Sequence, residues 1–152
     1  MKRFLPEEMM GRIAAVAGVA AGLTLLGTIV YGATTFGADS ADDGYRRFLK
    51  VAGIALAMLI GVAAGAHGTW RDSAKTGFTT LGSALIFTAL AMSMMMPWVE
   101  YPNDRYAAGW VWVMNGILPL LVTWGATTIL GRHATYVEPV GFEDSGTEMP
   151  TT

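Results

Sequence analysis

The stretch VAGIALAMLIGVAAGAHGTW at residues 51–70 decides the fold, because it holds no charged residue and lies between Lys50 and Arg71. A helix needs about 20 mainly apolar residues to cross the hydrocarbon core of a bilayer. Inside lipid the backbone must satisfy its own hydrogen bonds, which favours a helix. The stretch therefore predicts one membrane-spanning helix.

Three further charge-free windows surround it, at residues 13–38, 76–99 and 106–131. Each is long enough to span a bilayer, and none alternates in the way that strands of a membrane barrel do. The whole chain of 152 residues is 53% hydrophobic and 14% charged, with a mean hydropathy of +0.42. Soluble domains carry about 25% charged residues, so this composition argues against a water-soluble globule.

The expected architecture is all-α, an integral membrane four-helix up-down-up-down bundle at residues 1–132. Its helices are expected at about 8–36, 49–70, 76–98 and 106–131. The connections are short, so consecutive helices should be antiparallel and both termini should lie on one side. Residues 133–152 carry four acidic residues and no lysine or arginine, which predicts an acidic, flexible C-terminal tail.

The distribution of basic residues gives the expected orientation. The side with the termini holds six lysines and arginines, and the opposite side holds four (Lys2, Arg3, Arg12, Arg71, Lys75 and Arg132 against Arg46, Arg47, Lys50 and Arg105). Positive residues favour the cytoplasmic side of a membrane. We therefore expect a multi-pass protein with termini in the cytoplasm, or in the interior of an enveloped particle.

Large side chains on the predicted helices are expected to contact lipid or a hydrophobic partner. Leu81 is an example of an expected lipid-facing position. Trp70 and Trp124 are expected as anchors near one membrane interface, where tryptophan is enriched.

Small residues predict where the helices pack. Membrane helices associate by close packing, which glycine and alanine permit. The sequence GVAAG occurs at residues 18–22 and again at 61–65, so each place has a GxxxG pattern. The expected helix-packing residues are Gly18, Gly22, Gly53, Ala57, Gly61 and Gly65. One such seam is expected to join helices within the chain, and the other to contact another subunit.

A polar group is expected in the fourth window. Pro119 has no N–H to donate to the carbonyl of Asn115, so a kink is expected there. Together with Thr123, these residues form a candidate polar membrane site. A hinge or small polar site is one interpretation, and hydrogen bonding between helices is the other.

His67 and His133 are the two histidines of the chain. Both fall on the same side of the predicted bundle, so they are weak candidates for holding a haem or metal. The alternative is a histidine at the interface that bonds a neighbour or a headgroup. We predict no metal and no cofactor.

No catalytic pattern is present. The chain has no cysteine, no phosphate-binding glycine motif and no nucleophile–base set, so we predict that it is not an enzyme. Its scattered basic residues do not indicate nucleic-acid binding. The leading hypothesis is a structural or accessory membrane protein that packs with other membrane subunits or with itself in the lipid bilayer. The alternative is a small oligomeric transporter or channel with a polar site near Asn115 and Pro119.

Overall fold

A computed structural model describes residues 7–35, 43–71, 73–95 and 105–132. These residues form α1 (Glu7–Thr35), α2 (Asp43–Trp70), α3 (Ala74–Met95), α4 (Arg105–Trp112), the π-helical segment η1 (Val113–Ile117) and α5 (Leu118–Arg132). No strand occurs in this part of the chain, which confirms the all-α prediction. The predicted tail at 133–152 lies outside the described residues.

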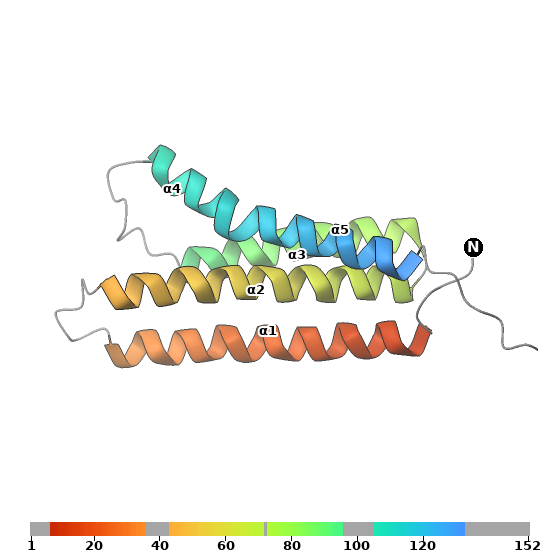
Figure 1. Ribbon diagram of the computed structural model, residues 1–152, viewed down its shortest axis with the longest axis horizontal. Coiled ribbons are helices and arrows are strands. Elements are labelled where there is room, and N and C mark those ends of the chain that lie inside the picture. The colour runs from red at the N-terminus through yellow and green to blue at the C-terminus, as the bar shows by residue number, and fades with distance from the viewer. Residues whose placement is uncertain (1–6, 36–42, 72, 96–104, 133–152) are drawn as a thin grey trace, which may run out of the picture.

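Within the described residues, four helices are long and apolar enough to cross a membrane: Glu8–Thr34, Arg47–Trp70, Ala74–Met95 and Gly109–Arg132. Successive spans run in opposite directions, and the start of α1 lies at the same end as the end of α5 (Figure 1). The second helix begins at Asp43 instead of near residue 49. The charged residues of its first turns lie outside the apolar stretch but inside the helix, because arginine and lysine are good helix formers.

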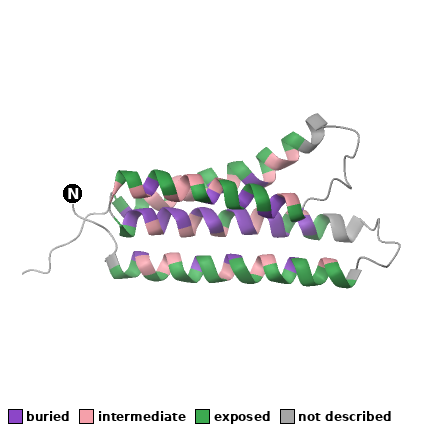
Figure 2. Cartoon of the chain, turned by 180° about the vertical axis from the view of Figure 1, so that it is seen from behind, coloured by how far each residue is buried: buried purple, intermediate pink, exposed green. Residues whose placement is uncertain are grey.

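Helix α2 lies at the centre of the arrangement. Helix α1 packs along one side of it, and α3 and α5 pack on the others, while α1 barely meets α3 (Figure 1). Half of the apolar span of α2 is buried, against 17% of that of α1 and 11% of that of the α4–η1–α5 span. Figure 2 shows this contrast, with buried residues concentrated on α2. The helices on the two edges therefore keep most of their surface uncovered.

The core is built largely from small side chains. Leu56 and Ala57 of α2 and Leu120 of α5 are fully buried at its centre. Leu81 and Trp124 are partly buried and pack against this core. The expectation that Leu81 faces lipid was wrong, because the close approach of α3 to the small residues of α2 draws its side chain inward. The anchoring of Trp124 at a membrane interface stays a prediction.

A tight connection joins α2 to α3. The backbone N–H of Arg71 donates to the carbonyl of His67 at 3.1 Å, which closes the last turn of α2. The N–H of Thr76 donates to the Ser73 hydroxyl at 3.4 Å, so Ser73 caps the start of α3. A methyl group added at Gly68 would lie 3.2 Å from the Cα of Gly77. The two backbones can meet this closely because both residues are glycine.

Candidate functional site: small-residue contacts and a groove beside α2

The small-residue seam of α2 packs inside the chain, against α5. A methyl group added at Gly61 would lie 2.5 Å from the Leu120 carbonyl oxygen and closer still to the Thr123 hydroxyl. One added at Gly65 would lie 2.8 Å from the Trp124 carbonyl oxygen. The other two residues of this seam, Gly53 and Ala57, are buried. This seam thus holds the chain's own helices together.

The small residues of α1 lie on two different faces of the helix. Ala17, Ala21 and Thr28 are buried on the face that packs against α2. Gly18 and Gly22 point elsewhere, because a methyl group added at either would meet no atom within 4 Å. The GxxxG residues of α1 therefore have room beside them that the described chain does not fill.

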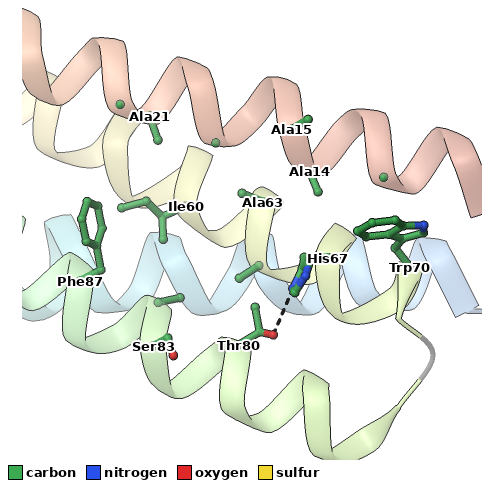
Figure 3. A pocket seen from close by; sticks show the side chains of 15 residues that line it. Ala14, Ala15, Ala21, Ile60, Ala63, His67, Trp70, Thr80, Ser83 and Phe87 are labelled. Atoms are coloured by element: carbon green, nitrogen blue, oxygen red, sulfur yellow. Dashed lines mark hydrogen bonds between the residues drawn. The ribbon is translucent and has the colours of Figure 1, made fainter.

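That room is a groove bounded by α1 and α3, with α2 as its floor (Figure 3). Its cavity volume is about 630 Å³. Small residues of α1, among them Gly18 and Gly22, form one wall, and Phe87 of α3 lies opposite Ala21. Most of the lining is apolar, as in typical ligand pockets.

One end of the groove is polar. The Thr80 hydroxyl donates to the Thr76 carbonyl at 2.6 Å. Its oxygen also lies 3.3 Å from His67 Nδ1, so in this pair Nδ1–H donates and Thr80 accepts. No hydrogen bond to Nε2 of His67 occurs among the described residues. The Trp70 ring, which also lines the groove, is 6.0 Å from the imidazole, and the guanidinium of Arg71 lies 5.1 Å from the centre of that ring.

The candidate metal ligands are not brought together in the part that the structure describes. His67 lies in the groove, and His133 lies outside the described residues. Within the described ranges, no group of three or more histidine, cysteine, aspartate or glutamate side chains could hold a metal ion.

The predicted kink coincides with the π-helical segment. In η1 the N–H of Leu118 donates to the carbonyl of Val113, one residue further back than in an α-helix. Figure 1 shows α4 diverging from α3 on the far side of η1. Such bulges accompany helix kinks and occur often at functional sites. Pro119 follows directly, and its missing N–H explains why the regular ladder is interrupted here.

None of the three polar candidates lines the groove beside α2. Asn115 and Pro119 are partly buried. The Thr123 hydroxyl donates to the Pro119 carbonyl at 2.7 Å and lies against Gly61. Thr123 thus packs α5 against α2, but its hydroxyl bonds to carbonyls of its own helix, so it provides no hydrogen bond between helices.

Most hydroxyls within the helices bond to their own backbone. Thr28 and Thr69, both buried, donate to carbonyls four residues back at 2.7 and 2.5 Å. Such bonds let a hydroxyl sit in an apolar interior. Two buried hydroxyls, those of Thr88 and Thr128, have no hydrogen-bond partner in the part of the chain that the structure describes.

Sequence reasoning did not single out Thr80, Ser83 or Phe87, which line the groove from α3. These residues fall in an apolar window with no distinctive spacing. They become candidate site residues only because they line the groove between α1 and α3, and that groove depends on how three helices cross. Of the residues that line it, sequence reasoning had singled out Gly18 and Gly22 of α1 together with His67 and Trp70 of α2.

Comparison with known proteins gave no relative: no family model matches the chain, and no curated protein or solved structure is significantly similar to it.

Proposed function

We propose that this chain is a multi-pass membrane protein with a structural or accessory role, acting within a larger membrane assembly or as a homo-oligomer. Its termini lie on the cytoplasmic or interior side. The larger assembly is a membrane complex or the membrane layer of an enveloped particle. It carries out no catalysis of its own.

The uncovered edge helices carry this proposal. Large apolar side chains of α1 and α5 remain more than half exposed, including Leu23 at 64% and Val122 at 59%. The chain's own polar groups are largely paired along their helices, so the described interior offers little to a polar solute. A surface of this kind fits lipid and neighbouring membrane helices. The seams of α2 build the bundle, and the edge helices meet the partner.

Two measurements test the location and the assembly. Alkaline extraction of the native membrane should leave the protein in the membrane pellet. Native mass spectrometry in mild detergent should then give either extra polypeptide mass, which reveals a partner subunit, or a multiple of 16.2 kDa. A monomer of 16.2 kDa under every mild extraction condition contradicts the proposed assembly.

Glycines at open positions outside the groove test the edge helices as contact surfaces. Gly27 of α1 and Gly125 of α5 have nothing within 4 Å of an added methyl group. Gly27→Leu or Gly125→Leu should therefore leave the monomer's fold unchanged. We expect at least one of them to weaken association about tenfold, because a helix interface tolerates bulk poorly where backbones meet. The complex fraction on native mass spectrometry measures this.

The matched control is Gly82→Leu on α3, another open position. It should affect neither fold nor association. If both edge variants associate as the parent does, these faces contact only lipid.

A second candidate is a small oligomeric transporter or channel, favoured by the π-helical segment around Asn115. In that case several chains together would line the path with Asn115 and neighbouring polar residues. Asn115→Leu should then abolish flux in reconstituted vesicles, while Ser93→Ala on α3 should retain it. Absence of flux in the parent protein eliminates this candidate.

A further inference from the structure

The groove beside α2 extends over only half the thickness of a membrane. Its α1 wall runs from Gly11 to Gly22, which is about 16 Å of helix at 1.5 Å per residue. The hydrocarbon core of a bilayer is about 30 Å thick, so the groove matches one leaflet. A membrane-spanning helix of a partner would need a groove along the whole length of the bundle, whereas an acyl chain of a lipid occupies only one leaflet.

The interior of the groove suits a flexible hydrocarbon chain. Its walls there are mostly alanines and glycines, with Ile60 and Phe87 beside Ala21 at the deep end (Figure 3). Ser83 also lines it, and its hydroxyl donates to the Thr79 carbonyl at 2.9 Å. Its volume of about 630 Å³ falls within the range of small-molecule pockets, roughly 300–1,000 Å³. With Gly18 and Gly22 in the wall, an occupant can lie directly against the backbone of α1.

The other end of the groove carries hydrogen-bonding groups and positive charge. His67, Trp70 and Thr80 line it (Figure 3), and Arg71 lies over the Trp70 ring. Trp70 also packs against Gly11, 3.3 Å from a methyl group added there. Histidine and threonine can hydrogen-bond a polar headgroup, and tryptophan favours the headgroup level of a membrane.

Among the side chains that the structure describes at this end of the bundle, cations outnumber carboxylates. Four cations belong to side chains described there, and Glu8 is the one carboxylate among them (Arg12, Arg71, Lys75 and Arg132 are the cations). Glu7 and Asp72 lie at the same end in the sequence, but their side chains are outside the described set. Clustered lysines and arginines attract anionic lipids at the cytoplasmic surface.

We infer that this groove binds one anionic phospholipid of the leaflet on the side of the termini. One acyl chain lies along α1 between α1 and α3, and the phosphate lies at the end formed by His67, Trp70 and Arg71. The bound lipid would connect α1 to α3, which the chain's own side chains hardly do. This inference rests on the proposed membrane location, but not on any protein partner.

The test uses the full chain in mild detergent, with phosphatidylglycerol or phosphatidylcholine of the same acyl composition added. Native mass spectrometry should show one retained phosphatidylglycerol, preferred over phosphatidylcholine by about tenfold. Gly22→Leu should reduce phosphatidylglycerol retention about tenfold, because its side chain fills the groove. Arg71→Gln should remove most of the headgroup preference while chain binding persists. Inorganic phosphate alone should not compete.

Gly27→Leu is the matched control, the same substitution at an open position of the same helix outside the groove. It should retain the lipid. Equal retention of the two lipids by the parent, or unchanged phosphatidylglycerol retention in Gly22→Leu, overturns the inference. If Gly22→Leu instead removes a bound polypeptide and leaves lipid retention unchanged, the groove holds a partner helix and the inference is also overturned. Polypeptide and lipid masses are resolved in one spectrum, so failure here is distinct from failure of the proposed assembly.

Discussion

Replacing Gly61 should be the most damaging single change in this protein. Gly61→Ala is expected to lower the free energy of unfolding by about 3 kcal/mol, the upper part of the usual overpacking range. The added methyl group would lie 2.5 Å from the Leu120 carbonyl oxygen and 3.1 Å from the Trp124 amide nitrogen. Both are backbone atoms, so relief requires α2 and α5 to separate. Gly61→Leu should fail to give a monodisperse protein.

Thermal unfolding in detergent, followed by tryptophan fluorescence, measures the effect. Gly82→Leu on α3 is the control, because a methyl group there meets nothing within 4 Å. Its midpoint should match that of the parent. If Gly61→Ala unfolds at the parent's midpoint, α2 and α5 do not approach as described.

The sequence predicted the number, type and approximate length of the helices because hydrophobic length is a property of each segment by itself. The same holds for the interruption near Pro119, where a missing N–H acts locally. The partner of each seam could not be predicted in this way. Both GVAAG segments have the same five residues, yet Gly61 and Gly65 pack against α5, while a methyl group added at Gly18 or Gly22 would meet no described atom within 4 Å.

The reason lies in the position of each helix within the bundle. Helix α2 has neighbours on several sides, so most of its small residues are covered, although Ala63 lines the groove. Helix α1 has essentially one neighbour, so a face turned only partly away from α2 stays open. Helix α2 packs against the face of α1 that carries Ala17, Ala21 and Thr28. Spacing in the sequence does not distinguish these two faces of α1, because small residues recur at helical intervals on both.

Leu81 illustrates the same limit for large side chains. In a membrane protein, leucine is equally suited to lipid and to the protein interior, so hydrophobicity does not distinguish the two. Leu81 packs against the core, while Leu90 on the same helix is 59% exposed. Only the crossing of α3 over α2 separates them. Leu90, and not Leu81, is therefore an exposed apolar position of α3.

The second large effect is expected at Leu120, which is fully buried where α5 meets the centre of α2. In water-soluble proteins, replacing a buried leucine by alanine lowers the free energy of unfolding by about 2–5 kcal/mol. In lipid or detergent the unfolded helix keeps its leucine in an apolar medium, so the transfer part of this cost shrinks. The cost of the cavity and of the lost packing contacts remains. We therefore expect Leu120→Ala to destabilise by about 2 kcal/mol, at the lower end of that range.

Leu121 provides the matched control, since it is the next residue of the same helix and 39% exposed. Leu121→Ala should change the free energy of unfolding by less than about 0.5 kcal/mol, as surface substitutions usually do. Unfolding in detergent over a range of denaturant compares the two variants in one host. Equal destabilisation would mean that α5 does not present Leu120 to α2. A small effect at Leu120 together with a large one at Leu121 would mean that α5 is rotated about its axis, and the contacts assigned to Gly61 would then be wrong as well.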